Sequence, residues 1–120
     1  MIAELLIAGA LAPAYTGRTA ENQPLRINVA GRRITRVKGL IRTYVCEEFG
    51  AVGPVEVAYR MNAPIGRDGH FSFVTGNHAE RLGVAGVIRG DRMTGRIRIA
   101  GTIGTGQRCR SRIVRFRLRG

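Results

Sequence analysis

Hydrophobic and polar residues alternate along most of the chain, in short runs separated by turn-forming residues. Successive side chains of a β-strand point to opposite faces, so each run predicts a strand with one buried and one wet face. Antiparallel sheets commonly have one face against the core and the other in solvent. The clearest runs are 25–29, 55–61, 96–99 and 114–118.

Four further apolar runs are less regular, and they lie at 34–37, 40–46, 70–74 and 82–88. Together the runs give eight or nine strands, and beyond the N-terminus no long stretch has a helical period. Many short strands about ten residues apart are typical of a two-layer sandwich or of a sheet closed on itself. We predict an all-β, antiparallel two-layer sandwich of the jelly-roll or immunoglobulin-like kind.

Turn-forming residues mark the boundaries between the runs. Asp68-Gly69 suits a tight hairpin, because glycine adopts the positive φ that such turns need. Gly83 and Gly86 interrupt one run, where a bulge or a close approach of two backbones is expected. The turn signals are Ala30-Gly31, Arg67-Asp68-Gly69, Gly90-Asp91 and Gly104-Thr105-Gly106.

The chain begins MIAELLIAGALAPA, an apolar run of about a dozen residues that is too short to span a bilayer. Such a run is typical of a secretory signal, and Ala12-Pro13-Ala14 has the small-x-small form of a cleavage site. We predict a signal-peptide remnant at 1–14 and one domain at 15–120. Glu4 and the lack of a preceding cation depart from the pattern, and a retained helix or first strand is the alternative.

Cys46 and Cys109 are the two cysteines, and no CxxC pair or zinc-type Cys/His cluster accompanies them. In an exported chain an even pair of cysteines predicts a disulfide. Cys46 ends one apolar run and Cys109 begins the last, so the bridge is expected to tie an early strand to the final one. The alternative is two buried thiols in a cytosolic protein, so the disulfide and the export depend on the same signal-like start.

The charge is strongly asymmetric, with 20 Lys and Arg against 8 Asp and Glu and a formal net charge of +12. This excess predicts an anionic partner: nucleic acid, an anionic glycan, a wall polymer or a membrane surface. A GC-rich genome, whose codons favour Arg, Gly, Ala and Val, is the alternative explanation. It accounts for the choice of Arg over Lys but leaves the shortage of acids unexplained.

The arginines of the last strands form the clearest candidate site. Alternate residues of a strand share a face at about 7 Å spacing, which is inside the Debye length of roughly 8 Å at physiological salt, so these cations repel one another. The planar arginine fork suits phosphate and sulfate. We predict anion binding by Arg96, Arg98, Arg115, Arg117 and Arg119, and the alternative is a solvated basic face that holds no ligand.

Aromatic residues decide between the anionic partners. Readers of single-stranded nucleic acid stack bases on aromatic side chains that lie between the cations. The period-two pattern instead directs Tyr59, Phe71, Phe73 and Phe116 toward the core. The expected polyanions are therefore a wall polymer, a glycan and nucleic acid, in that order.

No catalytic or cofactor motif is present. His70, Ser72 and Asp68 are near one another in sequence, but His70 and Ser72 are ordinary same-face neighbours of one strand. Adjacent Glu47 and Glu48 point to opposite faces in an extended chain, so they cannot flank one bond. The sequence predicts neither an enzyme nor a cofactor or metal site.

Several short motifs carry a resemblance over most of 15–120: Tyr15-Thr16-Gly17-Arg18-Thr19, then Asp68-Gly69-His70-Phe71, then Met93-Thr94-Gly95, with the two cysteines. This pattern resembles small secreted bacterial β-sandwich domains of unassigned function. The resemblance implies the fold, the export and the disulfide, and it implies no activity.

The sequence thus predicts a secreted or cell-wall-associated, non-enzymatic binding module. A structural or assembly subunit that pairs through exposed edge strands is the alternative. A small hydrolase is a remote third hypothesis.

Overall fold

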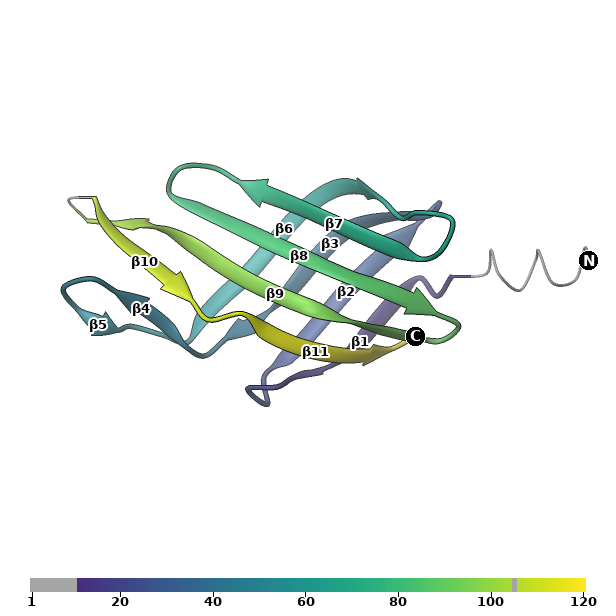
Figure 1. Cartoon of the computed structure of the whole chain (residues 1–120), viewed down its shortest axis with the longest axis horizontal. Coiled ribbons are helices and arrows are strands. Elements are labelled where there is room, and N and C mark those ends of the chain that lie inside the picture. The colour runs from purple at the N-terminus through teal and green to yellow at the C-terminus, as the bar shows by residue number, and fades with distance from the viewer. Residues whose placement is uncertain (1–10, 105) are drawn as a thin grey trace, which may run out of the picture.

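The computed structural model describes residues 11–104 and 106–120, and these form eleven β-strands (Figure 1). The prediction of an all-β protein is confirmed. The predicted signal remnant falls largely on residues 1–10, outside the described residues, and stays a prediction. The strands are β1 (Ala14–Thr19), β2 (Pro24–Ala30), β3 (Arg33–Ile41), β4 (Tyr44–Cys46), β5 (Gly50–Ala51), β6 (Val55–Pro64), β7 (His70–Gly76), β8 (Glu80–Arg89), β9 (Arg92–Ile103), β10 (Gln107–Ser111) and β11 (Val114–Arg119).

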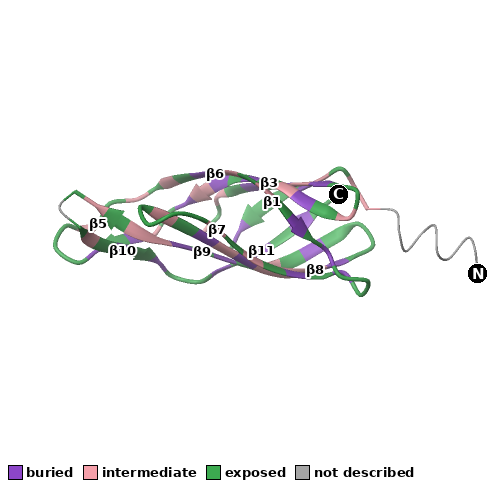
Figure 2. Ribbon diagram, turned by 90° about the horizontal axis from the view of Figure 1, so that it is seen from above, coloured by how far each residue is buried: buried purple, intermediate pink, exposed green. Residues whose placement is uncertain are grey.

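All eleven strands belong to one antiparallel sheet with the strand order β7–β8–β9–β11–β1–β2–β3–β6. The long strand β9 pairs along one edge with β8 and along the other with β11 and then β10, and β10 continues to β4 and β5. The sheet curls, so β7, β8, β9 and β11 lie across β1, β2, β3 and β6 (Figures 1 and 2). The pairing therefore shows one continuous sheet and does not show a sandwich of two separate sheets.

β6 and β7 follow each other along the chain without pairing within the described residues, so the sheet is open between them. Asp68-Gly69 turns the chain here, and Gly69 has the expected positive φ of 85°. The predicted tight hairpin is wrong, because the turn carries the chain from one layer of the curled sheet to the other. Hydrogen bonds hold this turn, from Gly66 N to His70 O at 2.8 Å and from Ile88 N to Gly69 O at 3.0 Å.

Two predicted strands, at 34–37 and 40–46, are differently divided in the structure. Gly39 lies within β3 opposite Leu25, and a Cβ on it would approach the carbonyl oxygen of Pro24 to 2.6 Å. The glycine therefore allows two strands to approach closely instead of ending one of them. β3 runs through it, and the remainder forms the short strand β4.

β1, β5 and β10 have no counterpart among the predicted runs, because small or polar residues occupy their inward positions. The buried Thr19 ends β1, and its Oγ1 accepts a hydrogen bond from Glu21 N at 3.2 Å. The buried Ser111 ends β10, and its hydroxyl accepts from Ile99 N at 2.9 Å. Hydrogen bonding satisfies these buried hydroxyls, so the strands need no regular apolar alternation.

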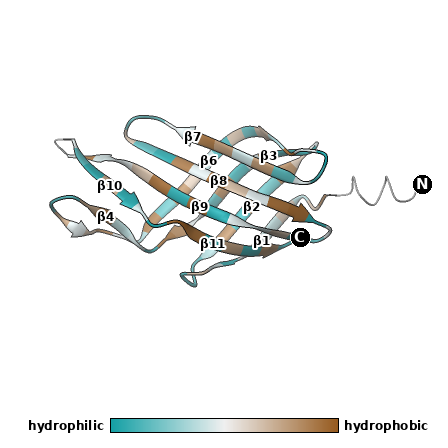
Figure 3. Ribbon diagram, viewed as in Figure 1, coloured by the Kyte–Doolittle hydropathy of each residue, from teal (hydrophilic) through white to brown (hydrophobic). Residues whose placement is uncertain are grey.

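The inward residues of the curled sheet form one hydrophobic core (Figure 2). Hydrophobic and hydrophilic residues alternate along the ribbons, as the sequence predicts (Figure 3). All the predicted inward residues of 25–29, 96–99 and 114–118 are buried. Each fully buried aliphatic or aromatic side chain contributes about 1.5–3 kcal/mol.

Tyrosines join parts of the sheet that backbone pairing leaves apart. The buried Tyr15 donates its hydroxyl proton to Gly90 O at 3.3 Å, which ties β1 to the β8–β9 turn. Across the open side, the Tyr59 hydroxyl of β6 donates to the Glu80 carboxylate of β8. Burial raises the pKa of both Tyr59 and Tyr44, and the nearby Glu80 carboxylate raises it further.

Gly86 marks a close approach between β8 and β9. A Cβ on Gly86 would lie 2.4 Å from Thr94 O and 2.9 Å from Phe71 Cζ, whereas a Cβ on Gly83 would have no neighbour nearer than 3.7 Å. The register of β8 is continuous through both glycines. Of the two expected causes, close approach is therefore confirmed at Gly86, and neither glycine marks a bulge.

Cys46 and Cys109 form the predicted disulfide. They lie directly opposite each other in the β4–β10 ladder, with their Cα atoms 4.0 Å apart and both side chains buried. The bridge does not reach the final strand as expected, because Cys109 lies in β10 and β11 begins five residues later. It therefore joins the short β4–β5 hairpin to the strand that leaves the end of β9.

Reduction of the disulfide is expected to lower the free energy of unfolding by about 4 kcal/mol, because the bridge closes a loop over a sequence separation of 63. Urea unfolding with and without reductant measures the difference. The double variant Cys46→Ser, Cys109→Ser is the control, and its midpoint should not respond to reductant. An equal midpoint for the oxidised and reduced wild type would contradict the prediction.

Gly86→Ala is expected to lower the free energy of unfolding by about 1–3 kcal/mol, because the added methyl group overpacks the interior. Gly83→Ala, in the same strand, is the matched control and should change stability by less than about 0.5 kcal/mol. Chemical denaturation of both variants tests this. Equal effects of the two substitutions would show that close approach at Gly86 does not limit packing.

Candidate anion-binding face

The strand register places cations directly opposite cations on the outer surface of the sheet. All of these side chains are exposed. Like charges directly opposite each other in a sheet are destabilising. The opposed pairs are Arg96–Arg115, Arg92–Arg119, Arg89–Arg92, Arg18–Arg117, Arg26–Lys38 and Arg36–Arg60.

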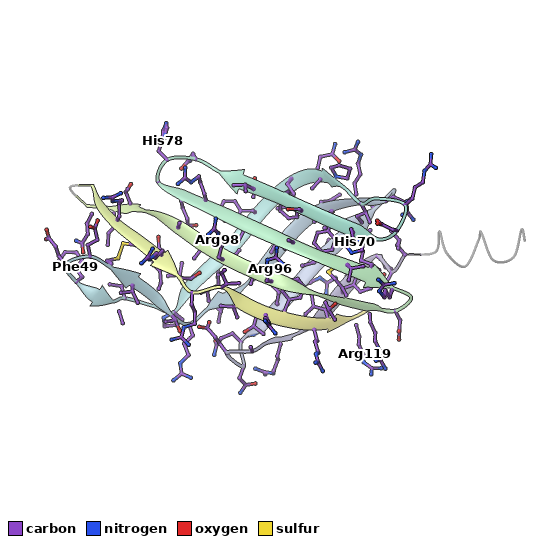
Figure 4. All side chains as sticks on the ribbon, in the orientation of Figure 1. Phe49, His70, His78, Arg96, Arg98 and Arg119 are labelled. Atoms are coloured by element: carbon purple, nitrogen blue, oxygen red, sulfur yellow. A yellow bond between two sulfur atoms is a disulfide. The ribbon has the colours of Figure 1, made fainter. Side chains whose placement is uncertain are left out.

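We call the outer surface of β9, β11 and β1 the arginine face. Of the five predicted site residues, Arg96 and Arg115 are brought together as one cross-strand pair. Arg117 and Arg119 continue the row along β11, whereas Arg98 lies opposite Gly83 of β8 and has no cation directly across from it. Figure 4 shows Arg96 and Arg98 near the middle of β9 and Arg119 toward the end of β11.

Arg18 and Arg92 belong to the same face, and the sequence-based prediction omitted them. Arg18 lies opposite Arg117, and Arg92 lies opposite Arg119. β1 lacks the apolar alternation that reveals an outward arginine. Arg92 does show such a signal, because it stands two and four residues before Thr94 and Arg96 and shares their face.

A shallow groove of about 600 Å³ runs over the arginine face. Arg18, Arg115 and Arg117 line it together with Thr94, whose side chain is also exposed. Arg18 donates one hydrogen bond from Nη1 to Asn22 O at 3.0 Å, which fixes its direction. None of the described residues that line the groove is Asp or Glu, so the charged side chains they contribute are all positive.

The acidic side chains lie mainly at turns, where they cap backbone groups. Glu21 accepts from Arg42 N at 2.9 Å, Glu47 accepts from Arg108 N at 3.0 Å, and Asp68 accepts from His70 N at 3.1 Å. The ion pairs between described residues are His70–Asp68 and Arg108–Glu47. Within residues 11–104 and 106–120, therefore, no carboxylate neutralises a member of the opposed cation pairs.

The predicted core aromatics do lie away from the arginine face. Phe71 and Phe116 are buried, and Tyr59 and Phe73 are half-buried against the core. Phe49 is 67% exposed, but it lies in the turn between β4 and β5, far from Arg119 (Figure 4). The arginine face therefore offers arginine and threonine side chains to a ligand and no stacking platform.

His70 and Asp68 form a turn contact at the surface. The His70 Nδ1 lies 3.1 Å from Asp68 Oδ2, and 60% and 72% of the two side chains are exposed. The hydrogen bond from the His70 backbone lowers the pKa of Asp68. Ser72 is on the same exposed face of β7, as expected for same-face neighbours. His70 and Ser72 line an open groove of about 590 Å³ together with Arg96.

The described residues contain no cluster of three or more His, Cys, Asp or Glu side chains positioned to hold a metal ion. Neither do they form a helix with the length and hydrophobicity needed to cross a membrane.

Comparison with known proteins identifies no relative. No protein-family model, no curated protein and no solved structure matches this chain. The resemblance to secreted sandwich domains therefore stays a prediction from the residues. The evidence that bears on function is therefore the geometry of the arginine face.

Arg115→Gln is expected to raise the free energy of unfolding by about 0.2–1 kcal/mol at low salt, because it removes the repulsion from Arg96. Added salt should shrink this gain by screening the pair. Arg112→Gln, in the exposed segment between β10 and β11, is the control and should have a smaller effect. Loss of stability in Arg115→Gln at low salt would contradict the prediction.

Proposed function

We propose that the protein is an exported, non-enzymatic binding module whose arginine face holds linear anionic polymers of the cell wall or extracellular space. The observation that carries this proposal is the row of opposed cations without acidic partners in the described chain. Such an arrangement costs free energy in the isolated protein. Polymeric anions that lie between the rows convert this repulsion into attraction and release their own counterions.

The spacing of the cations favours an extended polymer. Neighbouring strands lie about 4.8 Å apart, and outward residues repeat at about 7 Å along a strand. Cations at these spacings over β9, β11 and β1 form a two-dimensional array that is longer than any single small anion. A polymer can contact several rows at once, so weak individual contacts add to useful affinity.

The chemistry of the face favours phosphate or sulfate groups. Each guanidinium donates hydrogen bonds from a planar fork, which matches two oxygens of one such group. Wall phosphodiesters and sulfated glycans carry these groups without bases that need stacking. Because the face carries no aromatic side chains for base stacking, nucleic acid is a less suitable ligand than these two polymers.

Export is supported by the disulfide. Disulfides persist in oxidising compartments and are rare in the reducing cytosol. The Cys46–Cys109 bridge is buried and joins paired strands, as a structural disulfide does. The finer fold that we propose is a two-layer sandwich, and the two crossed layers of the curled sheet support it (Figure 2).

Retention on immobilised poly(glycerol phosphate) is expected to fall with salt and to be lost in the triple variant Arg115→Gln, Arg117→Gln, Arg119→Gln. Each removed cation should reduce the salt slope by about one. Heparin and oligo(dT) columns run in parallel rank sulfated glycan and nucleic acid against the wall polymer.

The matched control removes the same charge from exposed positions outside the strands, as Arg42→Gln, Arg67→Gln, Arg112→Gln. This control should retain most of the binding. If both triple variants lost the same amount of retention, net charge alone would explain the binding. Unchanged retention of the Arg115, Arg117 and Arg119 variant would overturn the proposal.

A second candidate function is assembly through a free strand edge. β7 pairs only with β8 among the described strands, and Val74 in β7 is 71% exposed. Such an edge is a template for pairing with another chain. A molecular mass that rises with concentration in light scattering, and that a charged residue at Val74 abolishes, would favour this function.

A further inference from the structure

A second groove lies on the outer surface of β8, β9 and β10, at the opposite end of β9 from Arg92. Its volume is about 380 Å³, and it shares no lining residue with the groove of the arginine face. Its lining includes the cations Arg81, Arg108 and Arg110, the acidic Glu47 that pairs with Arg108, and His78, together with Ala100 and Thr102. Cavities of this size are within the range of small-molecule sites.

The strand register builds this groove around one small residue. Ala100 of β9 pairs with Arg81 of β8 on one side and with Arg110 of β10 on the other. The two arginines therefore start about 10 Å apart, with an alanine between them. Both long side chains are exposed, and the short alanine side chain leaves a trough between them into which the guanidinium groups can converge.

The neighbouring row supplies a hydroxyl group and a cation that is already paired. Thr102 lies opposite Arg108, two residues along from Ala100 and on the same face. Arg108 Nε lies 3.4 Å from Glu47 Oε1 in the ion pair of that end. Its charge is thus offset, whereas Arg81 and Arg110 have no ion pair with a described carboxylate.

The walls of the groove are held in place from several sides. The disulfide through Cys109 fixes β10 between Arg108 and Arg110. Thr102 N donates to Ala79 O at 2.9 Å, which ties the end of β9 to the β7–β8 loop. The backbone of the groove is therefore fixed before a ligand binds, and the conformational cost of binding falls on the exposed Arg81 and Arg110 side chains.

We propose that this groove is a discrete site for one tetrahedral oxyanion, a phosphate or sulfate group, held between Arg81 and Arg110 over Ala100. Two forks that approach from opposite sides match the three-dimensional oxygens of such a group better than a planar carboxylate. The Thr102 hydroxyl provides a further donor on the same face. The site needs no contact with the arginine face and stands independently of polymer binding there.

Titration with inorganic phosphate, inorganic sulfate and acetate, followed by NMR of the Ala100 and Thr102 amides, tests the proposal on the full chain. Phosphate or sulfate should shift these amides and saturate, whereas acetate should bind at least several-fold more weakly. The preferred anion of the two identifies the group. Equal binding of acetate, or the absence of saturable shifts, would overturn the proposal.

Two variants separate the groove from general charge. Arg81→Gln, Arg110→Gln should weaken binding at least about tenfold, because charge-assisted hydrogen bonds are lost on both sides. Ala100→Leu keeps every charge and fills the trough, so it should weaken binding as well. If Ala100→Leu does not fold, Ala100→Val fills part of the same space on a β-strand position.

The matched control is Arg115→Gln, Arg117→Gln, which removes the same charge from the arginine face. It should leave phosphate or sulfate affinity within about twofold while it weakens polymer retention. If this control lost as much oxyanion binding as the Arg81 and Arg110 variant, the proposal of a discrete site in the groove would be overturned. Full binding by the Ala100 variants would also overturn it.

Discussion

Burial of the inner face of one curled sheet forces nearly every charged strand residue outward, because an unpaired charge in the core would cost several kcal/mol. The exception among the described strands is Glu80 of β8, whose carboxylate accepts a hydrogen bond from the Tyr59 hydroxyl. Because arginine occupies many of the outward positions, the strand register that completes the core also sets cation against cation. The core and the arginine face are thus two consequences of the same pairing. A one-residue slip of β11 against β9 would relieve Arg115 and Arg96 only by exposing Phe116.

The magnitudes show why this arrangement is stable. An opposed cation pair costs about 0.2–1 kcal/mol, whereas each buried side chain of the core contributes about 1.5–3 kcal/mol. The disulfide adds its constraint where the strands are shortest, at β4, β5 and β10. The free energy of burial in the core therefore outweighs the repulsion between the opposed cations. Relief of this repulsion would favour the binding of the anion that we propose.

The sequence predicts the all-β class, the disulfide, most inward residues and most turns, because each follows from local pattern or composition. It does not predict strand order or the continuous sheet, since alternation says which face is wet but not which strand is adjacent. β10 is missed because a bonded serine hydroxyl, Ser111, replaces an apolar residue in the core. The spacing predicts the candidate residues at 96, 98, 115, 117 and 119, of which the pairing sets Arg96 opposite Arg115 and Arg98 opposite Gly83. Arg18 and the row Arg81–Ala100–Arg110 become visible only through cross-strand pairing.

Because the acids lie mainly at turns and the cations lie mainly on strands, pH and ionic strength act on different parts of the molecule. Acidification protonates the Asp68 carboxylate, whose pKa the hydrogen bond from the His70 backbone lowers, and it leaves every guanidinium charged. Ionic strength acts mainly on the strands, where the like charges meet. The two solution variables therefore address different parts of one small fold, since acidity acts on the turn at Asp68 and salt acts on the opposed guanidinium groups.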